Sequence, residues 1–330
     1  MDLLRTAVAL LGALTLPWAL GALLYSGGGA EGIQGWRWLL ILGWLVLGRL
    51  LWSKLAGGHR FILPWLLLLP ALLVFLSVRP SNDREWSEDQ SRFPTARVES
   101  GQVHFKDIRD FRYSSATEWT PAWYDATYEL SDLEAAYYIV EHFADPEAIA
   151  HTMVSFRFSG DRFLSFSVEL HKEAGESYSP VRGLFRQYEL HYVVADERDA
   201  LQLRTSYRPS RVRLHPITAD RDRIEAYFLD LVARVNELAE QPEFYNSLAS
   251  SCTTNLADHL ESVTRHQVRM DYRVYLPGYS SELAWELGLL GQLELENVLV
   301  RDQITVDRIE ASRGLDDYSR IIRGEAALSL

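Results

Sequence analysis

The chain has 330 residues, a formal net charge of −12 and a single cysteine. The length allows one large domain or two modest ones, and a lone cysteine excludes an intrachain disulfide. Residues 79–330 hold nearly all the acidic side chains, with a net charge of about −15, so nucleic acid is a poor partner for their surface.

Three apolar runs occupy the first 78 residues, at 3–25, 36–52 and 61–78. The second is interrupted by Arg49, and the third contains two prolines. One such run could be the core helix of a soluble protein. Three in succession, joined by short connectors, predict a membrane anchor of three transmembrane helices.

Positive residues predict the orientation of this anchor. The connector before 36 has no Lys or Arg, whereas Arg49, Lys54 and Arg60 gather near the second connector. The positive-inside rule then predicts a cytoplasmic N-terminus and an exported C-terminal part. Alternatively, the first run is a signal peptide cleaved near Gly28–Ala30. Both versions predict a multi-pass inner-membrane protein with residues 79–330 in the periplasm.

The exported part begins with a polar linker at 79–100 and continues as an α+β domain at 101–330. Ser131 and Glu134 form a capping-box pattern that predicts a helix at 131–145. Alternation of apolar and polar residues then predicts strands, followed by helices. In chain order we expect strands near 103–113, 151–158, 162–171, 185–195, 200–207 and 211–217, a helix at about 220–240, and helices after Cys252 and Ser280. The expected fold is therefore an antiparallel sheet packed on helices.

The hairpin at 151–171 can be aligned by its hydrophobic pattern. Apolar residues match when paired positions sum to 320, which requires the three-residue loop 159–161. This register places His151 beside Glu169 on the polar face of the sheet, with His171 on the same face. A carboxylate beside an imidazole fixes its tautomer and stabilises its protonated form. The alternative is a surface ion pair of little energetic consequence.

Cys252 lies where a helix is expected to begin, next to Ser251, Thr253 and Thr254. A thiol in the first turn of a helix meets free N–H groups and the positive end of the dipole, which favour the thiolate. The polar neighbours argue against a buried structural cysteine, although that is the usual role of a lone one. Of nine histidines, His151 is the best placed as the base, and only His171 competes with it.

Other kinds of site find no support in the sequence. It has no Cys-x-x-Cys, no His-Glu-x-x-His and no Gly-x-Ser-x-Gly motif. The glycine-rich segment at 26–32 lacks the Lys and Ser or Thr of a phosphate-binding loop. We therefore expect no metal and no cofactor.

Several ordered motifs resemble the family of Lnb N-terminal periplasmic domains. They are "AHTMVSFRF", "FLSFSVELHKEAGESYSPVRGLFRQYELHYVVADERDALQLRTSYR", "PEFYNSLASSCTTNL" and "YLPGYSSELAWELG", and the similarity runs over about 105–325. The resemblance implies a permuted papain-like fold of the NlpC/P60 type, with His151, Glu169 and Cys252 as the functional residues. The family motif has Asn-Cys-Thr-Thr where this chain has Ser251 before the cysteine. Ser can cap a helix but reaches less far than Asn.

The resemblance further implies acyl transfer on lipoproteins, so the expected function is a membrane-anchored thiol acyltransferase or hydrolase. Its partners would be a membrane lipid or a lipoprotein. Two alternatives stay open: a cell-wall peptidase or amidase with the same thiol chemistry, and a non-catalytic envelope binding protein. Arg182, Arg186 and Glu189 either support the site or form a structural ion-pair network.

Overall fold

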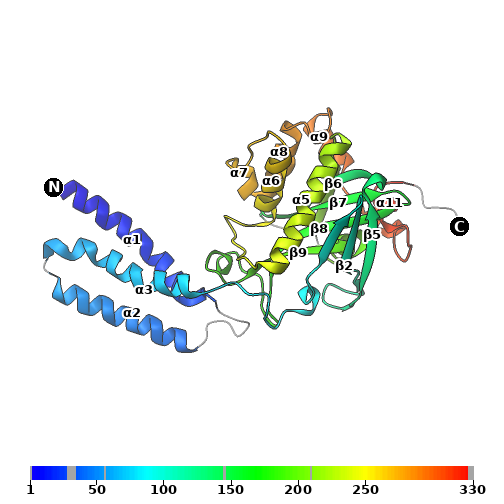
Figure 1. Cartoon of the computed structure of the whole chain (residues 1–330). Coiled ribbons are helices and arrows are strands. Elements are labelled where there is room, and N and C mark those ends of the chain that lie inside the picture. Colours follow the sequence, from blue (N-terminus) through cyan, green and yellow to red (C-terminus); the bar gives the residue numbers. More distant parts are fainter. Residues whose placement is uncertain (1, 28–34, 56, 144–145, 209, 326–330) are drawn as a thin grey trace. The chain divides into compact units, whose positions relative to one another are not determined.

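The computed structural model describes residues 2–27, 35–55, 57–143, 146–208 and 210–325 (Figure 1). The chain divides into two compact units. The first comprises Met1–Glu88, Leu170–Leu190 and Pro242–Ala249, and the second comprises Asp89–Glu169, His191–Gln241 and Ser250–Leu330. The first unit therefore combines the N-terminal helices with two later segments.

Three helices dominate the first unit: α1 (Asp2–Tyr25), α2 (Gly35–Lys54) and α3 (Leu63–Ser77). Within the described residues, one helix is long and apolar enough to cross a membrane, over Thr6–Tyr25 of α1. Helix α2 is nearly as long but carries three basic residues, and α3 has 15 residues, about 22 Å, short of a hydrocarbon core of about 30 Å. The expected three-span anchor is thus supported only at its first helix. The alternative cleavage site at Gly28–Ala30 lies outside the described residues.

A later segment of the chain completes the core of this unit. Phe185 is buried against Ala19, Ala22 and Ala71, residues of α1 and α3. Gly21 allows this packing, because a Cβ at that position would overlap the Phe185 ring. Helix α1 is therefore packed on one side by a residue that lies far from it in sequence.

The second unit is built around an eight-stranded mixed sheet. Seven strands follow the order β1-β2-β9-β8-β7-β6-β10, and the eighth, β5, pairs with β2. The pairing of β2 with β9 is parallel, whereas that of β6 with β7 and of β7 with β8 is antiparallel. The strands are β1 (Thr95–Glu99), β2 (Gln102–Arg109), β5 (Trp123–Glu129), β6 (Leu133–His142), β7 (Ala150–Phe158), β8 (Arg162–His171), β9 (Glu189–Asp196) and β10 (Arg211–Pro216); β3 (Arg112–Tyr113) and β4 (Trp119–Thr120) form a separate pair. Strand β1 thus lies within the expected linker.

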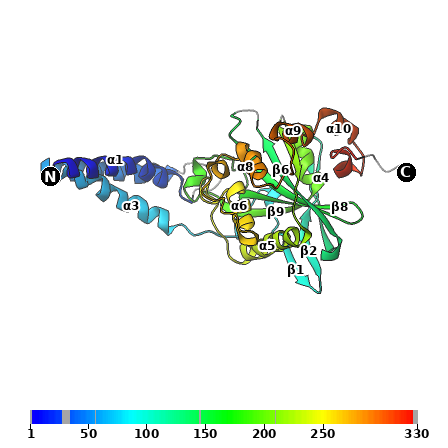
Figure 2. The same cartoon turned by 90° about the horizontal axis from the view of Figure 1, so that it is seen from above.

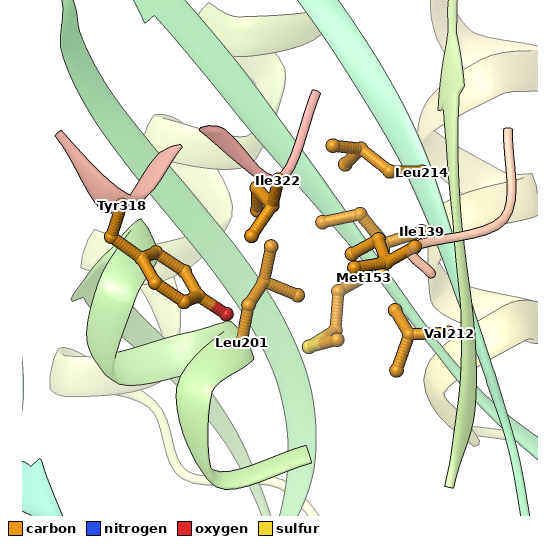
Figure 3. Packing of buried hydrophobic residues seen from close by; sticks show 8 residues of the cluster. Ile139, Met153, Leu201, Val212, Leu214, Tyr318 and Ile322 are labelled. Carbon is orange, nitrogen blue, oxygen red and sulfur yellow. The ribbon is translucent and has the colours of Figure 1, made fainter. Parts of the chain in front are cut away.

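Apolar side chains pack on both faces of this sheet. On one face, Phe228 contacts the rings of Phe156 and Phe166. On the other face, Met153 packs with Leu201, Tyr318 and other buried residues (Figure 3). The helices are α4 (Glu197–Gln202), α5 (Arg221–Glu240), α6 (Cys252–Val263), α7 (Tyr272–Tyr275), α8 (Ser280–Glu286), α9 (Leu295–Arg301), α10 (Val306–Ala311) and α11 (Tyr318–Ile321), with α5 beside α6 (Figure 2). The predicted α+β class is confirmed.

The predicted hairpin register is confirmed. Met153 pairs with Ser167, Val154 with Phe166 and Ser155 with Ser165, and every pair between β7 and β8 sums to 320. The loop contains Gly160 at φ +76° and Asp161 at φ +55°, left-handed conformations that suit a three-residue hairpin. Matching of side chains across the strands therefore sufficed to fix this register.

Two segments differ from expectation. Within the segment predicted as a helix at 131–145, Leu133–His142 forms β6, because its Tyr, Ile and Val side chains suit the centre of a sheet and β7 and β10 pair with it on either side. Residues 144 and 145 lie outside the described residues. The capping pattern at Ser131 instead belongs to a short 3-10 turn. The segment predicted as a strand at 200–207 is helical, forming the end of α4 and a π-helical turn at Leu203–Tyr207.

Candidate active site

Cys252 is the first residue of α6, and the residues around it cap the N-terminus of this helix. The Ser251 hydroxyl accepts from the Thr254 N–H at 3.5 Å, and the Thr254 hydroxyl accepts from the Ser251 N–H at 2.7 Å, which is a capping box. A helix leaves four N–H groups without intrahelical acceptors at its start. The box provides acceptors for the N–H groups of Ser251 and Thr254. The N–H groups of Cys252 and Thr253, which lie beside the thiol, have no acceptor within the helix.

His151 on β7 interacts with this thiol by hydrogen bonding and by charge. Burial raises the pKa of Cys252, but the hydrogen bond and the positive charge of His151, together with Thr152, lower it to about 6. Burial lowers the pKa of His151, but Cys252 more than offsets this and the net shift is upward. The two shifts favour a thiolate–imidazolium pair at neutral pH.

Ser167 connects His151 to Glu169. Its hydroxyl lies 2.7 Å from Nε2 of His151 and donates to Oε1 of Glu169 at 2.8 Å. Since the single hydroxyl proton goes to the carboxylate, the Ser167 oxygen must accept from Nε2–H of His151. The neutral imidazole therefore carries its proton on Nε2, and Nδ1 is the basic nitrogen left for Cys252. The predicted pair of His151 and Glu169 is joined through a serine.

Glu169 is held as a carboxylate by the groups around it. Burial raises its pKa, but the charges of Arg204 and Arg109 hold the pKa well below the usual range. Arg204 binds Oε1 at 3.1 Å and Gln90 donates to Oε2 at 3.0 Å. Arg204 also binds Glu141 at 2.7 Å, in a pair that is almost fully buried. The carboxylate can therefore accept from Ser167 throughout the neutral range.

The face that carries His151 is buried rather than solvent-exposed. The Glu169 side chain is only 17% exposed, and Ser155, Ser165 and Ser167 are buried. A surface ion pair, the alternative considered from sequence, does not describe this arrangement. The small serines on this face leave room for the residues that cover it.

Three neighbours of the candidate site were not expected from the sequence. Glu141 lies directly opposite His151 across the β6–β7 pairing, Arg204 bridges two carboxylates, and Ser167 forms the link to His151. Glu141 and Arg204 fall in the two segments whose secondary structure was expected otherwise, so their approach to His151 could not be inferred. Ser167 could have been found, because the predicted register puts it on the face of Glu169, two residues away.

The remaining predicted supporting residues belong to the first unit. His171 stacks on Trp86 with ring centroids 3.4 Å apart. Arg186 donates to the carbonyls of residues 75 and 78, at the end of α3, and Arg182 lies over the ring of Tyr25 at 5.8 Å. Glu189 forms a 2.7 Å ion pair with Arg84, and burial raises its pKa to about 7. These contacts fit a structural role within that unit.

Two further histidines belong to polar clusters of the second unit. His215 lies between Ser281 at 2.9 Å and Asp302 at 2.8 Å, and all three are buried. The sequence did not indicate this Ser-His-Asp arrangement, which ties β10 to α8 and α9. His259 contacts Asp230 at 2.6 Å and Tyr192 at 2.8 Å. Among the described residues, no group of three or more His, Cys, Asp or Glu side chains is arranged to hold a metal ion.

A cavity of about 280 Å³ lies between the sheet and helices α5, α6 and α8. Its wall includes Thr253, whose hydroxyl lies 3.7 Å from Sγ of Cys252 and 3.0 Å from the Thr152 hydroxyl. Tyr138 also lines it and donates to Ser280 at 2.8 Å. Most of the remaining wall is aliphatic, so an apolar space begins one residue from the thiol.

Comparison with known proteins gives one family match. Residues 119–278 match the family described as the Lnb N-terminal periplasmic domain. No curated protein and no solved structure matches the chain. A periplasmic domain together with one N-terminal apolar helix of spanning length fits a membrane-anchored protein of the cell envelope.

Proposed function

Since residues 119–278 form a Lnb N-terminal periplasmic domain, we propose that this envelope-associated protein is a cysteine-dependent acyltransferase or hydrolase. Cys252 is the nucleophile, His151 is the general acid and base, and Glu169 orients His151 through Ser167. The observation that carries the proposal is the Cys252–His151 pair backed by a half-buried, ionised carboxylate. A nucleophile, a base and an orienting group in hydrogen-bonded series are what thiol catalysis requires.

In the first step the Cys252 thiolate attacks the carbonyl carbon of an ester or amide. The carbonyl oxygen becomes an oxyanion, which the N–H groups of Cys252 and Thr253 are placed to stabilise. When this intermediate collapses, the bond to the leaving alcohol or amine breaks. The leaving group takes the proton from Nδ1 of His151, and a thioester on Cys252 remains.

In the second step an acceptor amine or alcohol, or water, attacks the thioester. His151 removes the acceptor's proton at Nδ1, and Cys252 departs as the thiolate. The same pair of residues thus serves transfer and hydrolysis, which differ only in the acceptor. Throughout, Nε2–H stays bonded to Ser167, which keeps Nδ1 directed at the reacting atoms.

The apolar cavity supports an acyl substrate over a cell-wall peptide. Peptide groups buried against an aliphatic wall would lose hydrogen bonds to water without replacing them, at a cost of about 1–3 kcal/mol each. A hydrocarbon chain has no such cost. We therefore propose a lipid or lipoprotein as the substrate. A peptidase of the same thiol chemistry is the alternative if the substrate binds outside the cavity.

A covalent-trapping experiment tests the proposal. The full chain is incubated in detergent with a lipopeptide that carries ester-linked acyl chains, and intact mass reports the acyl group on Cys252. We expect an adduct that hydroxylamine removes and that is absent in Cys252→Ala and strongly reduced in His151→Ala. Ser165→Ala, a buried serine on the same face, serves as the control and should behave as wild type.

Two results would count against the proposal. An adduct formed only with a peptide donor would favour the peptidase. No adduct with either donor, in a chain whose folding is verified, would favour a non-catalytic envelope binding protein.

A further inference from the structure

The cavity beside α6 follows one face of that helix from end to end. Six residues of this segment line it, spaced three or four apart in most steps. They are Thr253, Leu256, Ala257, Leu260, Val263 and Thr264. At 1.5 Å per residue the lining extends about 16 Å. The cavity is therefore elongated, and one end lies at the residue that follows the nucleophile.

Exposure of the wall changes along this path. Thr253, Leu256 and Ala257 are buried, whereas Leu260 and Val263 are half-buried. A group that extends from Cys252 along α6 thus passes from a closed to a more open environment. The space restricts the width of its occupant more than its length.

Small side chains keep this space open. Ala136 of β6, Ala257 of α6 and Ala284 of α8 line the cavity and are buried. Interiors are normally packed closely, and unfilled apolar volume costs stability. Three alanines that converge on one unfilled volume, where larger aliphatic residues would pack, indicate that the space accommodates a ligand.

We infer that Ala257 and Ala284 set the width of a channel that admits a single hydrocarbon chain whose carbonyl is presented to Cys252. This inference rests on the proposed function and adds to it the residues that select the substrate. The occupant follows from the aliphatic wall, the length of the path and the nearness of the nucleophile, whose Sγ lies 3.7 Å from the hydroxyl of the lining residue Thr253. One chain enters at a time, so a substrate with several chains keeps the others outside.

Acylation rates with donors of two chain lengths test the inference in the full chain. Ala257 lies about 6 Å along α6 from Thr253, so Ala257→Leu blocks the channel beyond a short acyl group. Hexadecanoyl transfer to Cys252 should fall at least about tenfold, whereas butyryl transfer should stay within about twofold. Ala284→Leu should act in the same direction from the opposite wall. Ala226→Leu, on an exposed position of α5, is the matched control and should change neither rate.

Thermal stability supplies a readout that simple disruption would not give. Because Ala257→Leu fills an existing void, its Tm should rise while hexadecanoyl transfer falls. Equal loss of both donors, or no loss of either, would overturn the inference. A lower Tm with loss of both donors would also overturn it, because the variant would then have damaged the site.

Photo-crosslinking separates this inference from the catalytic proposal. Cys252→Ala protein is exposed to hexadecanoic acid with a diazirine on its chain, and labelled peptides are mapped. Label within 253–287 that unlabelled hexadecanoic acid displaces, and that Ala257→Leu removes, supports the channel even if Cys252 proves inert. Absence of that label beside a reactive Cys252 overturns the channel and leaves the thiol chemistry standing.

Discussion

At the scale of single residues, the site depends on one hydroxyl group. Ser167 accepts from Nε2–H of His151 and donates to Glu169, so it fixes the tautomer of His151 and leaves Nδ1 as the basic nitrogen. If the Ser167 hydroxyl is removed, the Glu169 carboxylate is still present, but no hydrogen bonds connect it to the imidazole of His151. In the proposed mechanism Glu169 therefore acts indirectly, and both residues position His151.

We predict that Ser167→Ala slows alkylation of Cys252 at pH 7 roughly fivefold. Loss of one hydrogen bond, about 1 kcal/mol, weakens the imidazolium that supports the thiolate, so the apparent pKa of Cys252 should also rise. Alkylation rate against pH measures both effects. Ser165→Ala, two residue pairs closer to the hairpin loop and also buried, should leave the rate unchanged. A matching loss there would show that the effect is not specific to the hydrogen bonds of Ser167.

A second prediction concerns Glu169→Gln, which keeps the shape but removes the charge. The folded-state pKa of Glu169 lies well below its usual value. The carboxylate therefore adds stability that is fully present above the unfolded pKa and is lost as the pH falls further. We expect the variant to be less stable by about 2 kcal/mol at pH 7, with a smaller deficit below about pH 4. Urea unfolding at pH 7 and pH 3.5 checks this, and a deficit independent of pH would contradict it.

At the scale of elements, the start of α6 and the pairing of β7 with β8 create the site together. Both could be predicted from the sequence, the first from its capping residues and the second from its alternating pattern. The neighbours Glu141 and Arg204 could not. Glu141 lies in β6, where a capping-box pattern and helical spacing competed with strand propensity, and pairing with two neighbouring strands prevailed. Arg204 lies in a π-helical turn that no local pattern indicates.

The capping box yields a prediction about Ser251. Ser251→Ala removes the acceptor for the Thr254 N–H, so the free energy of unfolding should fall by about 1 kcal/mol. Ser251→Asn, which restores the residue expected from the family motif, should stay within a few tenths of a kcal/mol of wild type. Denaturant unfolding compares the three proteins. Equal stability of the alanine variant would show that the cap does not stabilise α6.

At the scale of the whole molecule, the N-terminal helices are not a detachable anchor. Phe185 from the 170–190 segment is packed against α1 and α3 within the first unit. The sequence indicated the apolar character of residues 1–78, but it could not reveal this packing, which joins residues more than 100 positions apart. Helix α1 can span a membrane and still pack against Phe185 through the side that carries Ala19 and Ala22.

We therefore predict that a chain beginning at Arg79 aggregates in the absence of detergent. Removal of the helices exposes Phe185 and its apolar neighbours, and exposed apolar patches promote association. Phe185→Ser in the shortened chain should raise its soluble fraction, as measured by sedimentation and gel filtration. Val181→Ser, at a position already exposed, is the control. A fully monomeric shortened chain would show that this packing is dispensable.

Activation of Cys252 by His151 can be measured as the rate of alkylation by iodoacetamide against pH. Cys252 is the only cysteine, so the signal has one source, and the urea-unfolded chain supplies the reference rate. We predict a midpoint of about pH 6 in wild type and a rise to about 8.5 or above in His151→Ala. A thiol that does not react while folded, or a midpoint near 8.5 that His151→Ala leaves unchanged, would show that His151 does not activate Cys252.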